Sequence, residues 1–323
     1  MCWSCYGGLL SSSLSSRPLP PQPSHPEQTT SNADRSEPQP AHEPRDASPA
    51  PATRYKLTLA YDGSAFHGWQ KQHPPDQEPL RTVQGELEQV LVRLLNTPTY
   101  MLGLLGASRT DSGVHALGQV AQFDAHCPIP IERLARAINA RLPDGLEVRS
   151  AEVAPPGFDC IGSVTNKQYR YRVFNAEHKP LWQRNAVYHC FGHTLDTARM
   201  QDAAQRLVGT HDVEGFAAAG HGRADTTRSI YDCQCFTDVA YPHEVHITIQ
   251  GSGFLYNMVR IIAGTLIEVG RGRFEPEQVD EILATADRRP AGPTLPPQGL
   301  CLEWIAYGDG EALDTVGIPQ SEI

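Results

Sequence analysis

Between residues 54 and 307, segments with the hydrophobic period of a β-strand alternate with segments that have the period of an α-helix. The run from Tyr55 to Tyr61 alternates large apolar residues with smaller or polar ones, as in a strand that is buried on one face. Thr82 can cap a helix whose apolar stripe extends to Leu95. A chain with this alternation is expected to form an α+β fold, in which helices pack on one face of a sheet of antiparallel strands.

The same patterns predict where the individual elements lie. Strands are expected near residues 55–61, 99–105, 117–124, 146–153, 167–174, 186–191, 228–237, 244–250 and 299–307. Helices are expected near residues 83–95, 130–141, 196–208, 255–269 and 276–286. A short Tyr-Pro-His turn region joins the strands at 228–237 and 244–250, which indicates an antiparallel pair.

The two ends of the chain differ in composition from its centre. Residues 1–53 are rich in Pro, Ser, Gln and Glu and poor in large apolar residues, so we expect a disordered extension. Its acid-free, Ser- and Leu-rich beginning also resembles an organelle transit peptide, although only Arg17 supplies positive charge before Glu27. Without such a peptide, a cytoplasmic protein is expected. Residues 308–323 carry four acids and no base, which predicts an acidic tail. Between the ends we expect two α+β halves, 54–165 and 166–307.

The formal net charge of the 323-residue chain is -10, which is unusual for a protein that binds nucleic acid. Residues 54–307, however, contain 28 acids and 24 bases, so this central part is only weakly acidic. Net charge controls solubility and long-range steering, but it does not determine what a local groove binds. No uninterrupted run of about 18 apolar residues is present, and no transmembrane helix is expected.

The eight cysteines do not have the spacing of a complete metal site. Cys2 and Cys5 form a Cys-x-x-Cys pair, but no second close pair follows with suitable histidines, and a structural zinc ion needs four ligands. Cys233 and Cys235 alternate on an expected strand and therefore face the same side. We expect buried free thiols, as in a protein of a reducing compartment, and no metal.

A loop from Arg109 to His115 has the sequence Arg-Thr-Asp-Ser-Gly-Val-His and places the carboxylate of Asp111 beside the cation of Arg109. It follows an apolar run and precedes a strand-like run, and catalytic groups are often carried on loops that a rigid scaffold holds. An Asp before Ser-Gly can also serve only to cap a turn. Asp-Ser-Gly is in addition the aspartic-protease signature, but that chemistry needs two carboxylates, and no second motif is present.

The segment Lys-Gln-Tyr-Arg-Tyr-Arg alternates two tyrosines with two arginines. On a strand, Tyr169 and Tyr171 share one face, and Arg170 and Arg172 share the other. Such a strand fits stacking on nucleobases and pairing with phosphates. It also fits a simpler arrangement, in which the tyrosines belong to the core and the arginines face solvent.

Two further segments are candidates for a functional site. Arg260 lies early in a largely apolar helix, where a buried cation needs a carboxylate partner, and Asp111 is a candidate for that partner. A Gly-rich turn after the first strand carries the aromatic residues Phe66 and Trp69. These rings can either pack in the core or stack on a nucleic acid.

Taken together, these segments resemble the tRNA pseudouridine synthase A family. The matching pieces follow the order of the family from about residue 54 to residue 307. They are Tyr61-Asp62-Gly63, Gly68-Trp69-Gln70, Thr82-Val83-Gln84, Arg109 to His115, Asn139-Ala140-Arg141-Leu142-Pro143, Lys167-Gln168-Tyr169-Arg170-Tyr171, Met258-Val259-Arg260, Glu268-Val269-Gly270 and Gly299-Leu300.

The resemblance implies a pseudouridine synthase fold, with an eight-stranded antiparallel sheet shared by two α+β halves and a cleft between them. It implies a homodimer that acts on positions 38–40 of the tRNA anticodon stem-loop without a metal or an organic cofactor. Asp111 would be the essential carboxylate, and Arg260 would pair with it. Arg109 would help to displace the target base, and Tyr169 would stack on that base and assist proton transfer.

This chain departs from the family's usual pattern at three places. It has Phe158-Asp159-Cys160-Ile161 where the family has Phe-His-Ala-Arg, so an arginine that faces RNA is missing there. Ser108 replaces a glycine and Ser112 an alanine, and both changes are expected to have little effect because the residues are small.

The implied reaction breaks the N1–C1′ bond of uridine and joins C5 to C1′, so no atoms enter or leave and no cofactor is demanded. Asp111 must be ionised for this chemistry, and an adjacent guanidinium is expected to keep its pKa low. There are two alternatives. One is a synthase that acts on other tRNA uridines, and the other is a tRNA-binding module without activity. Measured turnover distinguishes the binding module from an enzyme.

Overall fold

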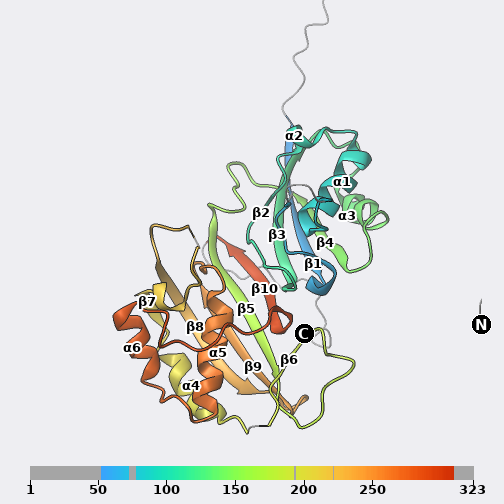
Figure 1. Ribbon diagram of the computed structural model, residues 1–323. Helices are drawn as coiled ribbons and strands as arrows, with labels where there is room; N and C mark the ends of the chain where they lie inside the picture. Colours follow the sequence, from blue (N-terminus) through green and yellow to red (C-terminus); the bar gives the residue numbers. More distant parts are fainter. Residues whose placement is uncertain (1–51, 73–77, 193, 221, 309–323) are drawn as a thin grey trace, which may run out of the picture. The chain divides into compact units, whose positions relative to one another are not determined.

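The computed structural model describes residues 52–72, 78–192, 194–220 and 222–308. Figure 1 shows the arrangement of their helices and strands. The Cys2–Cys5 pair, residues 1–51 of the predicted disordered extension and the predicted acidic tail beyond Gly308 lie outside these residues. The predicted end of the extension at residue 53 is slightly too late, because Thr53 is the first residue of a strand.

The strands occur in two groups along the chain. The first group consists of β1 (Thr53–Tyr61), β2 (Leu105–Gly106), β3 (His115–Ala125) and β4 (Leu146–Val153). The second consists of β5 (Val164–Phe174), β6 (Tyr188–His189), β7 (Gly209–Asp212), β8 (Thr227–Thr237), β9 (Glu244–Gly251) and β10 (Leu300–Tyr307).

The helices lie between these strands. They are α1 (Val83–Leu95), α2 (Thr99–Leu102), α3 (Ile131–Asn139), α4 (Thr197–Gln205), α5 (Met258–Gly270) and α6 (Gln278–Thr285), with short 3-10 turns at Gly63–Ala65, Glu214–Phe216 and Pro297–Gly299. As expected, the Thr82 side chain caps α1 by accepting a hydrogen bond from the Gly85 N–H.

The ten strands of the described residues belong to one sheet, so the predicted α+β class is confirmed. The order along the sheet is β4-β1-β3-β10-β5-β9-β8-β7, with β2 paired to β3 and β6 paired to β5. The sheet is mostly rather than wholly antiparallel, because β10 pairs with β3 in parallel through Cys301–His115 and Leu302–Ala116, and β6 pairs with β5 in parallel. The predicted antiparallel pairing of β8 with β9 is confirmed. The β3–β10 pair joins strands that are far apart in the sequence, as parallel pairing requires a crossover connection and not a hairpin turn.

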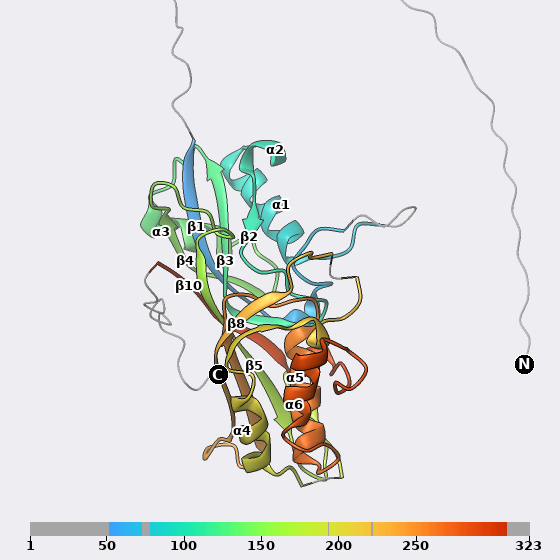
Figure 2. The same cartoon turned by 90° about the vertical axis from the view of Figure 1, so that its left-hand side faces the viewer.

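One face of the sheet carries the main hydrophobic core. Figures 1 and 2 show α4, α5 and α6 on the same face of the strands β5, β8 and β9, and α4 packs against β8. Tyr171, Ile247 and Cys233 point into this core from neighbouring strands and are fully buried. Cys233 and Cys235 are buried free thiols, as predicted. None of the helices in the described part of the chain has both the length and the apolar composition needed to cross a membrane.

The prediction of a strand at 99–105 is wrong. Residues Thr99–Leu102 form one helical turn, and Gly103 ends it with a φ of 53°. Only Leu105 and Gly106 then pair with β3. A short apolar run has no period that separates a strand from a buried helical turn, so the pattern could not distinguish them. The strand expected at 186–191 is also shorter than predicted and contains only Tyr188 and His189.

Candidate active site

Asp111 lies on the loop between β2 and β3. The segment between β1 and α1 packs against the backbone of this loop. The Trp69 N–H donates to the Thr110 carbonyl oxygen over 3.0 Å. Gly68 has a φ of 87°, and a Cβ atom added there would lie only 2.7 Å from the same oxygen. Because the two backbones touch, this position accepts only glycine without strain. Phe66 and Trp69 are buried, which confirms the packing interpretation of these two rings and not the stacking one.

A buried glutamine fixes the beginning of the loop. The Gln119 side-chain amide donates from Nε2 to the Ser108 carbonyl oxygen over 2.7 Å and accepts at Oε1 from the Ser108 N–H over 3.2 Å. Its Nε2 also donates to the Tyr61 hydroxyl, which hydrogen-bonds to Thr110 Oγ1 over 2.8 Å. Both Ser108 and Thr110 are therefore held by polar groups that are shielded from water, and such networks are rigid when every member is satisfied.

Arg260, in the first turn of α5, reaches the carboxylate of Asp111 as predicted. Its Nη1 lies 3.4 Å from Asp111 Oδ2. The same guanidinium donates from Nε to the Leu295 carbonyl oxygen over 2.6 Å and from Nη1 to Asn257 Oδ1 over 2.6 Å. Residues 149 positions apart in sequence are thus brought together by the fold.

The expectation that a neighbouring guanidinium keeps the pKa of Asp111 low is wrong. Burial raises the pKa of this carboxyl above its ordinary value, and the opposing attraction of Arg260 is smaller. Loss of water disfavours the charged form, and an ion pair of 3.4 Å compensates only in part. Folding therefore disfavours the charged form of Asp111.

Tyr169, in the centre of β5, also belongs to this site. Its hydroxyl hydrogen-bonds to Ser108 Oγ over 2.8 Å, and its ring meets the ring of Phe254 edge-on at 5.2 Å between centroids. Burial, with a smaller contribution from the nearby charge of Asp111, raises the pKa of Tyr169 to about 12. Ser108, one of the three departures from the family pattern, therefore provides a partner for the phenol that glycine could not provide.

Arg109 is exposed, and in the described part of the chain no hydrogen bond or ion pair joins it to Asp111. Its place beside the carboxylate in the sequence does not become a contact, because the loop turns it outward. Lys167 lies on the same strand as Tyr169 and donates from Nζ to the Ala107 carbonyl oxygen over 2.8 Å. Burial, with a further contribution from the charge of Arg223, lowers the pKa of Lys167 to about 8. The two residues next to Ser108 in the sequence thus each bring a cationic side chain near it: Arg109 carries its own, and the Ala107 carbonyl oxygen binds that of Lys167.

The arginines of β5 are neither free for phosphates nor simply solvated. Arg170 pairs with Glu303 over 2.8 Å, and Arg172 pairs with Glu244 over 2.9 Å. Tyr169 and Tyr171 are buried on the other face. The alternation of the strand was predicted correctly, but the carboxylate partners come from β9 and β10 and could not be identified from the sequence.

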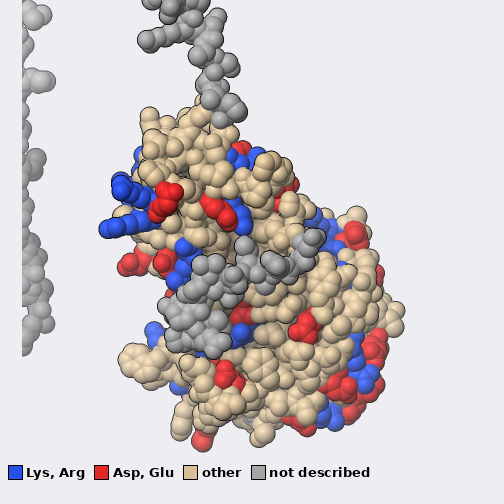
Figure 3. Space-filling view, turned by 180° about the vertical axis from the view of Figure 1, so that it is seen from behind, with Lys and Arg blue, Asp and Glu red and all other residues tan. Residues whose placement is uncertain are grey.

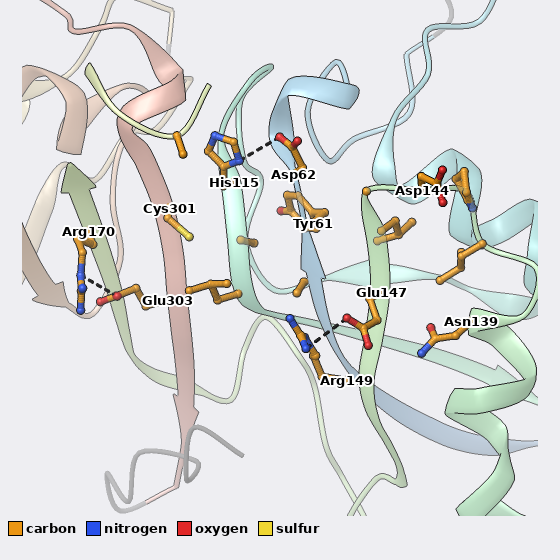
Figure 4. Close-up of a pocket in the computed structure, with 18 of the residues that line it drawn as sticks. Tyr61, Asp62, His115, Asn139, Asp144, Glu147, Arg149, Arg170, Cys301 and Glu303 are labelled. Carbon is orange, nitrogen blue, oxygen red and sulfur yellow. Dashed lines mark ion pairs between the residues drawn. The ribbon is translucent and has the colours of Figure 1, made fainter. Parts of the chain in front are cut away.

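A hollow of about 540 Å³ lies on the arginine-bearing face of the sheet and not at Asp111. Figure 4 shows Arg170 and Glu303 on one side of it and Arg149 and Glu147 on the other, with His115 near Asp62. Three ion pairs lie within this lining, Arg170–Glu303, Arg149–Glu147 and His115–Asp62. Figure 3 shows that cationic and anionic residues are interspersed on the face opposite to that of Figure 1. On the part of this face that is not covered in Figure 3, neither sign of charge predominates.

Three residues of the site were not identified by sequence reasoning as functional. Ser108 was regarded only as a small replacement, whereas Gln119 and Asn257 were not considered. The sequence pattern could have indicated Gln119, because it is a polar residue on the apolar face of a strand, opposite Leu59. In the described residues no group of three or more histidine, cysteine or acidic side chains is arranged to bind a metal ion.

Comparison with known proteins shows extensive similarity. The sequence model of a family described as "tRNA pseudouridine synthase" matches residues 58–161 and 203–308, which include Asp111 and Arg260. The protein named tRNA pseudouridine synthase A in Bacillus subtilis is 44% identical over 256 residues, which cover 79% of this chain and 99% of that protein. Proteins with the same name from Bacillus velezensis and Acetivibrio thermocellus are 43% identical over 258 residues and 39% identical over 255 residues. The matches cover 79% and 78% of this chain and 99% and 98% of those proteins.

Proposed function

The chain belongs to the tRNA pseudouridine synthase family, and from this premise we propose that it isomerises uridines of the tRNA anticodon stem-loop, with Asp111 as the essential carboxylate. The family is one of isomerases that act on tRNA. The observation that carries the assignment of the site is the meeting of Asp111, Arg260 and Tyr169, from a loop, a helix and a strand that are remote in sequence.

Mapping of pseudouridine in tRNA incubated with the protein tests this proposal. We expect product at uridines of the anticodon stem-loop, at positions 38–40. Product confined to other tRNA positions would overturn the choice of substrate site. Unchanged uridine in tRNA that the protein nevertheless binds would identify a binding module in place of an enzyme.

The reaction requires a carboxylate near C1′ of the target nucleotide. Asp111 serves either as a nucleophile that attacks C1′ or as a base that promotes a glycal-type intermediate, and both routes need its ionised form. The N1–C1′ bond breaks, the uracil turns, and C5 bonds to C1′. The proton on C5 is then lost, and N1 gains a proton. The half-buried position of Asp111, beside the edge-packed rings of Tyr169 and Phe254, supports a site that holds the detached uracil away from bulk water.

Arg109 is proposed to replace the target base in its stack. A base paired in a stem must leave the helix before its C1′ is accessible, which costs a few kcal/mol. The exposed guanidinium, two residues from Asp111 on a firmly held loop, is free to fill the vacated space or to bond phosphates. Its outward direction, which separates it from Asp111, supports this role.

Tyr169→Phe tests whether the phenol takes part in proton transfer. We expect a lower rate of turnover with little change in tRNA binding, because the ring stays and only the hydroxyl is lost. Ser108→Ala is the companion variant, since it keeps the phenol and removes the hydroxyl that anchors it at 2.8 Å. Single-turnover rates of the two variants provide the measurement. A normal rate for Tyr169→Phe would leave the residue a stacking role alone.

Salt dependence of tRNA affinity tests the contribution of phosphate contacts. If Arg109 and neighbouring cations bind phosphates, the logarithm of the association constant should fall linearly and steeply with the logarithm of salt concentration. Arg109→Gln should reduce that slope by roughly one phosphate contact. The measurement is a filter-binding or fluorescence titration from low to high salt. A flat profile would contradict a cationic site for tRNA.

The assembly and location of the protein are also part of the proposal. The family resemblance supports a homodimer in the cytoplasm, built from two α+β halves, 54–165 and 166–307, per chain. Light scattering of the purified protein tests the assembly, and a fully active monomer would contradict it.

A further inference from the structure

Asn257 has a backbone conformation that residues other than glycine rarely adopt. It precedes α5 with φ 59° and ψ 5°, in the left-handed region. This conformation costs about 1–2 kcal/mol for a residue with a Cβ atom, although asparagine tolerates it better than most. Residues held in this way are concentrated at functional sites, where the surrounding structure requires them. The Asn257 side chain does not cap α5, so local helix stability does not explain its presence.

Its side chain is instead directed to the guanidinium that faces Asp111. Asn257 Oδ1 accepts from Arg260 Nη1 over 2.6 Å, and the same nitrogen lies 3.4 Å from Asp111 Oδ2. The Leu295 carbonyl oxygen holds Nε of the same group. A planar guanidinium bound at two of its nitrogens cannot rotate freely. The shorter hydrogen bonds are those to Asn257 and Leu295, so these two groups, and not the carboxylate, fix the orientation of Arg260.

We propose that Asn257 is a positioning residue, which holds Arg260 toward Asp111 and thereby sets the pH range in which Asp111 is ionised. The inference rests on the proposed function of Asp111. The left-handed backbone turns the amide back over the first turn of α5, and this accounts for an asparagine where a glycine would be free of strain. A fixed guanidinium also stays in place when the carboxylate loses its charge during the reaction.

The test uses Asn257→Gly, because glycine adopts this backbone freely and only the amide is lost. We expect kcat to fall roughly tenfold or more, as for a small displacement of a catalytic group. We also expect the acidic limb of the kcat–pH profile to move to higher pH, because a loosely held Arg260 opposes the effect of burial on Asp111 less well. Affinity for tRNA and the melting temperature should remain close to those of the parent protein.

Asn96→Gly is the matched control. Asn96 is exposed, ends α1 and has φ 50°, so the variant makes the same backbone change far from Arg260. It should leave both kcat and the pH profile unchanged. A double-mutant cycle with Arg260→Lys completes the test, since loss of Asn257 should have little further effect when the guanidinium is already absent.

Three results would overturn the proposal. They are an unchanged pH profile in Asn257→Gly, an equal loss of activity in Asn96→Gly, and a full additional loss of activity in the Arg260→Lys background. Failure of the proposed function is a different result, because the parent protein would then form no pseudouridine before any variant is compared.

Discussion

Asp111→Asn should abolish pseudouridine formation while tRNA binding is retained. The substitution keeps the shape of the side chain and removes the charge that attacks C1′ or acts as the base. Loss of a group that acts at the reacting atoms typically lowers turnover by about 10³-fold or more. The measurement pairs a single-turnover assay with a tRNA titration. Residual turnover near that of the parent protein would remove Asp111 from its role.

The same variant should melt at a higher temperature than the parent at neutral pH. Burial raises the pKa of Asp111 in the folded protein, so folding favours its neutral form. The corresponding stability is fully present below the pKa of the unfolded chain and is lost as the pH rises through the folded pKa. Asparagine is neutral at every pH and therefore avoids this loss. The difference between variant and parent should diminish in acid.

Asp144→Asn is a suitable control for both measurements, because Asp144 is an exposed carboxylate that lines the hollow on the other face of the sheet. It should change neither turnover nor the pH dependence of the melting temperature. A lower melting temperature for Asp111→Asn at neutral pH would show that the attraction of Arg260 outweighs burial, and that the stated sign is wrong.

Gly68→Ala should reduce both stability and turnover strongly. Alanine is strained at φ 87°, and its Cβ would lie 2.7 Å from the Thr110 carbonyl oxygen and 3.1 Å from the Asp111 carbonyl carbon. We expect a loss of about 2–4 kcal/mol in the free energy of unfolding. Because the clash is with backbone, the loop must move, and a displacement of about 1 Å can cost about 100-fold in rate. Denaturant unfolding and single-turnover rates provide the measurements.

Gly157→Ala separates backbone strain from displacement of the loop. Gly157 has φ 77°, but an added Cβ would meet no atom within 4 Å. It should lose about 1 kcal/mol of stability and keep normal turnover. Equal rates for Gly68→Ala and the parent would show that the contact with Thr110 does not position Asp111.

The hydrophobic period identified most of the sheet and the longer helices, because it depends only on which side chains each segment must bury. It failed for residues 99–105, where an apolar run between Pro98 and Gly103 had no period to measure. The Arg109–His115 motif located the loop for which we propose the catalytic role. The position of Arg260 in an apolar helix identified a cation that needed a carboxylate, and the partner inferred for it, Asp111, is confirmed.

The sequence by itself determined the α+β class and the loop that carries Asp111, because local hydrophobic periods place the strands on either side of that loop. It also indicated Asp111 as a candidate partner of Arg260, because a buried cation needs a carboxylate, and the family resemblance implied the same pair. Only the tertiary structure decided the sign of the pKa shift of Asp111, the hydrogen bonds of Gln119 to Ser108, and the hydrogen bond of Arg260 to Asn257. Each depends on how deeply a group is buried or on a hydrogen bond between distant segments. Burial and hydrogen bonds between distant segments are established only when the strands assemble in their final order, so no local sequence pattern contains them.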